Sequence, residues 1–213
     1  MLWRPTVVYP ERVPPTGGCI LAASHRSSLD TSLLAYVTKR RIRFMGKAEL
    51  WRVAGVGLVF SALGAFPVDR HIVDRTALET ALAVLGSGEA LGVFPEGTRR
   101  SGPTVEHLHN GVAYLALRAS VPVIPVGIGG SQQILPKGRK LPKRGRIVIV
   151  LGEPVYPRTG ALSGSRPHLR RENVDAMTAD ITRSLQAAFQ EAEELLARRP
   201  GRSGLPSHAQ TRD

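Results

Sequence analysis

The heptapeptide Ser24-His25-Arg26-Ser27-Ser28-Leu29-Asp30 follows directly on the apolar run Cys19-Ile20-Leu21-Ala22-Ala23. That run is short and compact, which favours a buried strand, and the amphipathic run 29–37 that comes next favours a helix. On one regular helix, His25 and Asp30 would point about 140° apart, because a turn holds about 3.6 residues. The two side chains meet only if His25 precedes the helix and Asp30 lies in its first turns. The carboxylate then fixes the tautomer of the ring and supports the charge that the imidazole gains with a proton.

The same heptapeptide has a second interpretation as an ordinary helix start. Ser27-x-x-Asp30 fits a capping box, with Ser27 as the cap and Asp30 at the third helical position. His25 would then be polar surface beside a cap. The heptapeptide alone leaves both interpretations open, and the rest of the chain has to decide between them.

Apolar runs and helical spacing alternate along the chain. Strands are predicted at 6–9, 19–23, 64–68, 90–94, 121–128 and 147–151, and helices at 29–37, 48–62, 74–86, 107–119 and 170–198. This alternation predicts an α/β fold, a single domain with a largely parallel central sheet flanked by helices and a long C-terminal helix. We expect residues 1–165 to form the core, 166–199 an amphipathic helix packed on it, and 200–213 a disordered tail.

Composition limits the classes of partner and compartment. The chain has 213 residues and a formal net charge of +12, which predicts an anionic partner such as nucleic acid, an anionic membrane or a phosphorylated substrate. Its one cysteine, Cys19, excludes a disulfide framework and lies in an apolar strand, so we interpret it as a buried small residue. No secretory signal is visible, and no apolar run approaches the roughly 20 residues of a membrane-spanning helix.

A second polar turn follows the predicted strand 90–94. Phe94-Pro95-Glu96-Gly97-Thr98-Arg99 places an acid, a glycine and an arginine at a strand end. Gly97 lets the backbone approach a ligand closely, and the planar fork of Arg99 matches phosphate. Arg70, after a short strand, is a further candidate phosphate ligand. The alternatives are a solvated turn for the first site and an ion pair of Arg70 with Asp69 or Asp74 for the second.

Four segments together resemble the glycerolipid acyltransferase family typified by lysophosphatidate acyltransferase, over roughly residues 6–155. They are His25-x4-Asp30, Gly64-Ala65-Phe66-Pro67-Val68-Asp69-Arg70, Phe94-Pro95-Glu96-Gly97-Thr98-Arg99 and Val121-Pro122-Val123-Ile124-Pro125-Val126. Lys47-Ala48-Glu49-Leu50 is also similar to the family. Each block is weak by itself, whereas four in the family's order are a strong signal.

Three features depart from the family pattern. Ser24 stands where the family usually has Asn before the histidine, and Leu108-His109-Asn110-Gly111 stands where it often has Phe-Lys-x-Gly. The missing lysine puts the details of substrate binding in doubt. The chain also begins close to the first block, so we expect no N-terminal membrane helices of the kind that many relatives carry.

The resemblance implies a 1-acylglycerol-3-phosphate O-acyltransferase of phospholipid biosynthesis. It implies that His25 is the general base on the free hydroxyl of lysophosphatidate, that Asp30 orients His25, and that the acyl group comes from acyl-CoA or acyl carrier protein. It further implies that the acceptor is held by Arg70, Glu96, Gly97, Thr98 and Arg99. Because a thioester is already activated, neither a metal nor another cofactor is expected.

Other functions remain open at this point. Within the family, the acceptor could be glycerol 3-phosphate, another lysophospholipid or a lipid alcohol. A different class is a non-catalytic basic module that binds an anionic membrane. Nucleic acid is disfavoured because the basic residues are not interleaved with stacking aromatics, and no recognition motif occurs. A metal site at His107-x-His109 is disfavoured because no ordered carboxylate or cysteine set accompanies it.

A basic loop in the sequence indicates how the chain could bind a membrane that holds a lipid substrate. Between Pro136 and Arg146 lie Lys137, Arg139, Lys140, Lys143, Arg144 and Arg146. Cations near an anionic membrane contribute about 1 kcal/mol each, so we expect a peripheral protein on the cytoplasmic face of the membrane. Apolar residues of 53–60 could enter the interface, although core packing explains them equally well. A solvated hairpin tip is the alternative for the loop.

Overall fold

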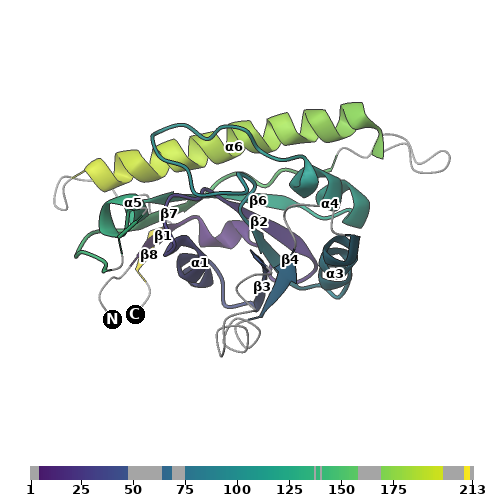
Figure 1. Cartoon of the computed structure of the whole chain (residues 1–213), viewed down its shortest axis with the longest axis horizontal. Coiled ribbons are helices and arrows are strands. Elements are labelled where there is room, and N and C mark those ends of the chain that lie inside the picture. Colours follow the sequence, from purple (N-terminus) through teal and green to yellow (C-terminus); the bar gives the residue numbers. More distant parts are fainter. Residues whose placement is uncertain are drawn as a thin grey trace.

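The structure, a computed structural model, describes residues 5–47, 64–68, 75–136, 138–139, 141–157, 169–198 and 209–211. One sheet of eight strands, in the order β4-β3-β5-β2-β6-β7-β1-β8, forms its centre (Figure 1). The strands are β1 (Thr6–Val8), β2 (Cys19–Ala23), β3 (Ile42–Lys47), β4 (Ala65–Val68), β5 (Ala90–Val93), β6 (Val123–Gly129), β7 (Val148–Leu151) and β8 (Ala209–Thr211).

Most neighbouring strands run parallel. The pairs β4–β3, β3–β5, β5–β2, β2–β6 and β7–β1 are parallel, whereas β6–β7 and β1–β8 are antiparallel. β2 lies in the middle, with Ile20 opposite Leu91 of β5 on one side and Val123 of β6 on the other. The predicted α/β class with a largely parallel sheet is confirmed. Parallel central strands put the turns after β2, β5 and β6 at one edge of the sheet.

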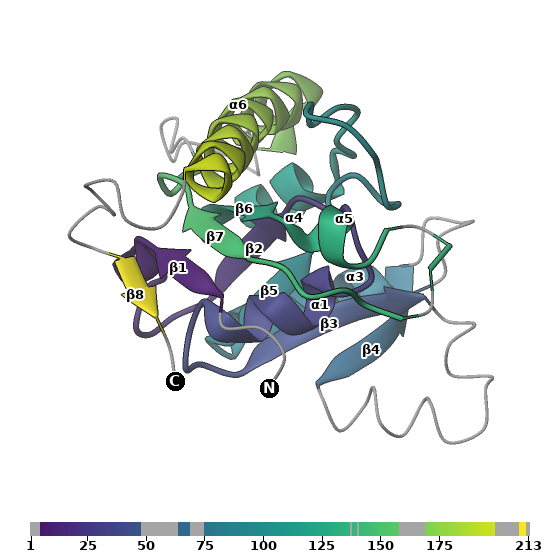
Figure 2. The same cartoon turned by 90° about the vertical axis from the view of Figure 1, so that its left-hand side faces the viewer.

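Helices cover both faces of the sheet. They are α1 (Asp30–Leu33), α3 (Arg75–Gly86), α4 (Gly111–Ala119), α5 (Ser131–Ile134) and α6 (Arg171–Ala197), with short 3-10 turns η1 (Pro10–Arg12) and η2 (Leu34–Tyr36). In Figure 1, α6 runs along one side of the sheet with α4 and α3 beside it, and α1 lies on the opposite side. Figure 2 shows the same layers from the end that carries α1 and α5.

The alternation of side chains along β2 divides the core between these two faces. Cys19, Leu21 and Ala23 belong to the cluster that includes Leu33 and Leu34 of the α1 side. Ile20 and Ala22 belong to the cluster of α3, α4 and the first half of α6. All five residues of β2 are fully buried, as a continuous apolar run in a central parallel strand predicts.

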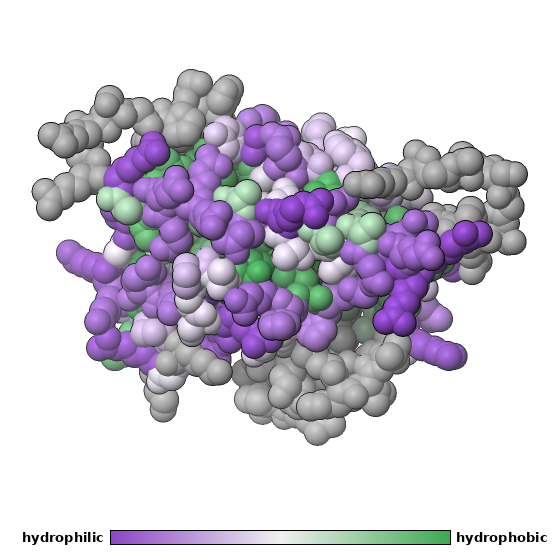
Figure 3. Space-filling view, turned by 90° about the horizontal axis from the view of Figure 1, so that it is seen from above, coloured by the Kyte–Doolittle hydropathy of each residue, from purple (hydrophilic) through white to green (hydrophobic). Residues whose placement is uncertain are grey.

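The long helix α6 is fastened to the sheet by an apolar stripe. The residues that share this stripe are buried: Val174, Met177, Ile181, Leu185, Ala188, Phe189, Ala192 and Leu195. At Gly127 of β6 the helix comes so close that a Cβ would lie 2.2 Å from the carbonyl oxygen of Ala188. The outer side of this layer is largely hydrophilic (Figure 3). The helix therefore packs on the core through one face and presents a polar face outward.

Three predicted elements differ from those observed. The helix expected at 107–119 starts at Gly111, and His107 before it has a positive φ of 54°. The helix expected at 29–37 is one turn, α1, continued by the 3-10 turn η2. Residues Ala209–Thr211, expected to be disordered, form β8 and pair with β1, so the prediction is wrong for them.

Some predictions lie outside the described residues. They include the helix at 48–62, the apolar segment 53–60, Asp69, Arg70 and Asp74, and most of the tail. Among the helices that the structure does describe, none combines the length and the apolar character needed to cross a membrane.

Candidate active site

The ring of His25 and the carboxylate of Asp30 lie in contact. His25 Nδ1 is 3.0 Å from Asp30 Oδ2. His25 sits in the turn between β2 and α1, and Asp30 is the first residue of α1. The sequence predicted that the two side chains meet if His25 precedes the helix and Asp30 lies in its first turns, and the structure shows this arrangement. The side chain of Asp30 is fully buried and that of His25 is 15% exposed, so the ring is the member of the pair that solvent reaches.

The carboxylate of Asp30 also holds the turn itself. Its Oδ2 accepts hydrogen bonds from the backbone N–H of Arg26 at 2.6 Å and of Ser27 at 2.7 Å. The second of these is half of the predicted capping box. The other half differs, because the Ser27 hydroxyl accepts the backbone N–H of Leu29 at 3.3 Å instead of that of Asp30, while it donates to the carbonyl of Leu135 at 2.8 Å. The two interpretations of the heptapeptide are therefore compatible: one carboxylate fixes the turn and contacts the imidazole.

The turn after β5 supports His25 through Glu96. Glu96 is fully buried, and its Oε2 accepts the backbone N–H of His25 at 2.8 Å. Its carboxylate pairs with the guanidinium of Arg26, whose Nη1 lies 2.8 Å from Oε1 and 2.9 Å from Oε2. Both carboxylate oxygens are thus engaged by the His25 turn. Glu96 was predicted to contact the acceptor, but these contacts favour a role in positioning His25.

Arg26 is a fully enclosed cation. Its guanidinium also donates to the carbonyl oxygens of Gly102 at 3.3 Å and Thr104 at 2.8 Å, and it lies 4.7 Å from the ring centroid of Phe189 in α6. A buried charge needs a partner and further hydrogen bonds to offset its desolvation. Arg26 has both, so it joins the His25 turn, the segment 102–104 and α6.

The backbone and the ring of His25 are each fixed by the β5 turn. The carbonyl oxygen of His25 accepts the backbone N–H of Arg100 at 2.9 Å. The imidazole stacks on the ring of Phe94, with 4.0 Å between centroids and an interplanar angle of 22°. With its N–H on Glu96, its carbonyl on Arg100 and its ring between Phe94 and Asp30, His25 has a defined orientation.

The remaining predicted residues of the β5 turn lie on its open side. Gly97 has φ of 68° and donates its N–H to the carbonyl of Phe94 at 3.0 Å. A Cβ there would come within 2.8 Å of His109 Nε2, so the ring of His109 lies against Gly97. Thr98 is exposed and Arg99 is partly exposed. These positions are open to a ligand next to His25.

Two other predicted residues have separate outcomes. Arg70 lies outside the described residues, so its place relative to His25 stays a prediction. Cys19 is fully buried in β2, as expected. Burial raises the pKa of its thiol, and the nearby guanidinium of Arg40 only partly opposes this effect. Within the described ranges, no group of three or more His, Cys, Asp or Glu side chains is arranged to hold a metal ion.

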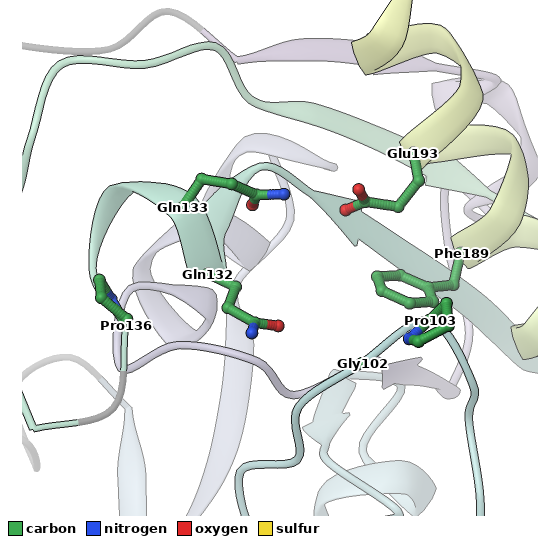
Figure 4. Close-up of a pocket in the computed structure, with 7 residues that line it drawn as sticks. All are labelled: Gly102, Pro103, Gln132, Gln133, Pro136, Phe189 and Glu193. Carbon is green, nitrogen blue, oxygen red and sulfur yellow. The ribbon is translucent and has the colours of Figure 1, made fainter.

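A cavity of about 400 Å³ lies between α5, α6 and the segment at Gly102. Figure 4 shows the residues that line it: Gly102, Pro103, Gln132, Gln133, Pro136, Phe189 and Glu193. None of the predicted site residues belongs to this lining. The cavity adjoins Arg26 through Phe189 and Gly102.

The sequence prediction missed three residues that shape the site. Arg26 and Ser27 look like solvated turn residues in a polar heptapeptide, yet both are buried. Ser24, noted only as a departure from the family pattern, is fully buried, and its hydroxyl accepts the backbone N–H of Ile128 at 3.0 Å. A small hydroxyl thus ties β2 to β6 at the start of the turn. Adjacency to His25 is the sequence signal for Ser24 and Arg26, and the capping-box pattern is the signal for Ser27.

Comparison with known proteins places this site in a family. The model of the Acyltransferase family matches residues 4–129, which include β2, the His25 turn, the β5 turn and β6. The 1-acyl-sn-glycerol-3-phosphate acyltransferase of Bacillus subtilis (strain 168) is 27% identical over 187 residues, covering 87% of this chain and 88% of that protein. The human 1-acyl-sn-glycerol-3-phosphate acyltransferase beta is 27% identical over 75% of this chain and 58% of its own.

A solved structure agrees in fold. The 1-acyl-sn-glycerophosphate (LPA) acyltransferase PlsC from Thermotoga maritima superposes with a TM-score of 0.69 at 28% identity, covering 92% of this chain and 74% of that one. The family model spans more than half of the chain and includes the turn that holds His25 and Asp30. The chain therefore belongs to the acyltransferase family.

Proposed function

We propose that this chain transfers a fatty acyl group from an acyl thioester, either acyl-CoA or acyl carrier protein, to the free hydroxyl of lysophosphatidate. The observation that carries the proposal is the 3.0 Å contact between His25 Nδ1 and the buried carboxylate of Asp30. The relatives described above support the acceptor, because they are named for 1-acyl-sn-glycerol-3-phosphate. His25 is the proposed general base and Asp30 the carboxylate that orients it.

The contact supports Nε2 of His25 as the ring nitrogen that acts as the base. If Nδ1 donates its proton to Asp30 Oδ2, the lone pair of the neutral imidazole is on Nε2. Nε2 makes no hydrogen bond to other described residues of the chain, so it can accept the proton of the acceptor hydroxyl. The imidazolium that forms is stabilised by the adjacent carboxylate, which is the role of the third member in a histidine-based catalytic set.

The reaction then balances without a cofactor. The acceptor oxygen attacks the thioester carbonyl while its proton passes to Nε2 of His25. The tetrahedral intermediate collapses by breaking the carbon–sulfur bond, and the leaving thiolate takes the proton back from the imidazolium. A positioned base contributes about 100- to 10,000-fold to such a step, and the remainder comes from holding the two substrates in register.

The acceptor phosphate has a natural place beside the β5 turn. Arg99, Gly97 and Thr98 form the open side of this turn. The hydrogen bond from the Arg100 N–H to the His25 carbonyl holds the turn next to the proposed base. We assign phosphate binding to Arg99, with Thr98 and the Gly97 backbone beside it, and also to Arg70. Glu96 acts from behind the turn by holding Arg26 and the His25 backbone.

The experiment is a thiol-release assay with purified protein. Each of acyl-CoA and acyl carrier protein donors is paired with lysophosphatidate, glycerol 3-phosphate and a lysophospholipid with a larger head group. We expect release that depends on lysophosphatidate and that disappears in folded His25→Ala protein. Thiol release only with glycerol 3-phosphate would contradict lysophosphatidate as the acceptor. If no pair of donor and acceptor gave acceptor-dependent release, the proposal that the chain is an acyltransferase would be wrong.

Two variants test the roles within the site. Asp30→Asn keeps an oxygen for the two backbone N–H groups but removes the charge, so turnover should fall while the fold survives. Arg99→Ala should raise the Michaelis constant of the acceptor by one to two decades, because a hydrogen bond between charged groups contributes about 1.5–3 kcal/mol. If only the Michaelis constant of the thioester donor rises, Arg99 binds the donor and not the acceptor phosphate, and the assignment is wrong.

A further inference from the structure

The loop between α5 and β7 exposes a large apolar side chain among cations. Leu141 is 77% exposed, in the sequence Arg139-Lys140-Leu141-Pro142-Lys143-Arg144. In the described part of the chain, the one other strongly exposed large apolar residue is Tyr156, at 65%. Burial of the Leu141 side chain against a partner would therefore contribute roughly 1.5–3 kcal/mol to binding.

The loop lies at the same edge of the sheet as His25. β2 and β6 are parallel, so the His25 turn after β2 and helix α5 after β6 emerge side by side (Figure 2). The Ser27 hydroxyl joins them directly by donating to the Leu135 carbonyl at 2.8 Å. The far side of the loop is fixed to the same root, because Lys143 N–H donates to the Ile134 carbonyl at 2.9 Å. The root of the loop is therefore held beside the His25 turn.

The described cations of this loop differ in whether their side chains are engaged within the chain. From the sequence, Arg146 belongs to the basic loop. Its Nη1 donates to the carbonyls of Leu196 and Arg198 at the end of α6. Arg139 and Arg144 are exposed, and their side chains form no hydrogen bond or ion pair with other described residues. The group that can meet a partner is thus Leu141 with Arg139 and Arg144 on either side, which we call the loop tip.

We infer that the loop tip docks the edge of the sheet that carries His25 on an anionic membrane. Leu141 inserts among the lipids, and Arg139 and Arg144 contact the lipid phosphates. A nucleic acid would use the arginines but has no place for an unstacked leucine, whereas a lipid surface accepts both groups. The choice of a lipid surface rests in part on the proposed function, because lysophosphatidate is itself a membrane lipid. The geometry brings the acceptor to the edge where His25 lies.

Vesicle sedimentation with matched variants tests this inference. The full chain is mixed with vesicles of neutral phosphatidylcholine, alone or with an anionic lipid such as phosphatidylglycerol, at 0.1 M and 1 M salt. Leu141→Ser is compared with Tyr156→Ser, and Arg139→Gln/Arg144→Gln with Arg170→Gln/Arg171→Gln. Both control positions lie toward the opposite edge of the sheet. Tyr156 follows Val155, which pairs with Val123 at the start of β6, and Arg170 and Arg171 begin α6.

Each half of the loop tip has its own expected signature. The two loop arginines should together contribute about 10- to 30-fold to binding at 0.1 M salt, since one cation near an anionic surface contributes roughly fivefold. That contribution should vanish at 1 M salt, where the screening length is about 3 Å. Leu141→Ser should weaken binding by about tenfold at both salt concentrations, because burial of an apolar side chain is not screened. The two control variants should bind as the wild type does.

Three results would overturn the inference. These are equal binding of the wild type to neutral and anionic vesicles, unchanged binding by Leu141→Ser, and equal losses in the control variants. Displacement of the protein from vesicles by an RNA oligonucleotide, with no effect of Leu141→Ser on RNA binding, would assign the cations to nucleic acid instead. Sedimentation needs no turnover, so failure here is distinct from failure of acyl transfer. The loop variants should retain wild-type thiol release on short-chain lysophosphatidate below its micelle-forming concentration.

Discussion

The backbone N–H of His25 donates to the carboxylate of Glu96 at 2.8 Å, across a separation of 71 residues. The same carboxylate pairs with Arg26, the residue next to His25. The turn after β5 therefore fixes the turn after β2 through one buried acid. The conformation of the candidate base therefore depends on a buried ion pair.

Removal of either member of this pair should destabilise the fold. Arg26→Met and Glu96→Gln each leave a buried charge without its partner, and we expect each to lower the free energy of unfolding by about 3–5 kcal/mol. The double variant Arg26→Met/Glu96→Gln should lose clearly less than the sum of the single losses. Urea denaturation of the four proteins measures the coupling. Additive losses would show that the pair does not act as a unit.

The Gly97→Ala variant tests the open side of the β5 turn. Alanine at φ of 68° is strained by about 1 kcal/mol, and its Cβ would lie 2.8 Å from His109 Nε2. We expect lower stability in urea denaturation and a higher Michaelis constant for the acceptor. Because His109 is an exposed side chain, Gly97→Ala/His109→Ala should recover the part due to the contact but not the part due to backbone strain. Full recovery in the double variant would contradict the strain argument.

The approach of α6 to the sheet at Gly127 is a separate test of the fold. A Cβ there would be 2.2 Å from the backbone oxygen of Ala188, so Gly127→Ala requires the helix to move. We expect a loss of about 3 kcal/mol in the free energy of unfolding. Gly86→Ala is the matched control, because nothing lies within 4 Å of its Cβ. That variant, at the end of helix α3, should be neutral or slightly stabilising, and equal losses in both variants would contradict the packing argument.

The thiol of Cys19 should be inert in the folded protein. It is fully buried, and burial raises the pKa, which lowers the fraction of reactive thiolate at pH 8. A chromogenic disulfide reagent should react with one equivalent of thiol only after urea unfolding. Cys19→Ala should keep acyl transfer within about twofold, whereas loss of transfer in a stable Cys19→Ala protein would make the cysteine part of the reaction.

The sequence predicts most strands of the core because they are continuous apolar runs, whereas β3, whose sequence mixes cations with apolar residues, was not predicted. The run Cys19–Ala23 is buried on both faces, and the stripe of α6 has strict helical spacing. The start of α4 was placed too early because Leu108 fits the helical spacing. The segment before it instead bends at His107 and is held by Gln186, whose side chain accepts the Val105 N–H at 2.6 Å. Tertiary contacts with a helix 81 residues away cannot be read from local spacing.

For the site, spacing and family pattern were enough to pair His25 with Asp30. They did not reveal that Glu96 faces Arg26, because a glutamate in a strand-end turn and an arginine in a polar heptapeptide both look solvated. Only the parallel neighbours β2 and β5 bring these turns together and bury the pair. The strand β8 was also unpredictable, since a polar tail gains its order from pairing with β1.

The most direct test of the account is the turnover of His25→Ala protein with lysophosphatidate and an acyl thioester. The side chain of His25 is partly exposed and makes its one recorded hydrogen bond, among the described residues, to Asp30, so the variant should fold with a midpoint near that of the wild type. The account predicts that thiol release falls by at least about 100-fold, the lower end of the contribution of a positioned base. Near-wild-type release by folded His25→Ala protein would contradict it.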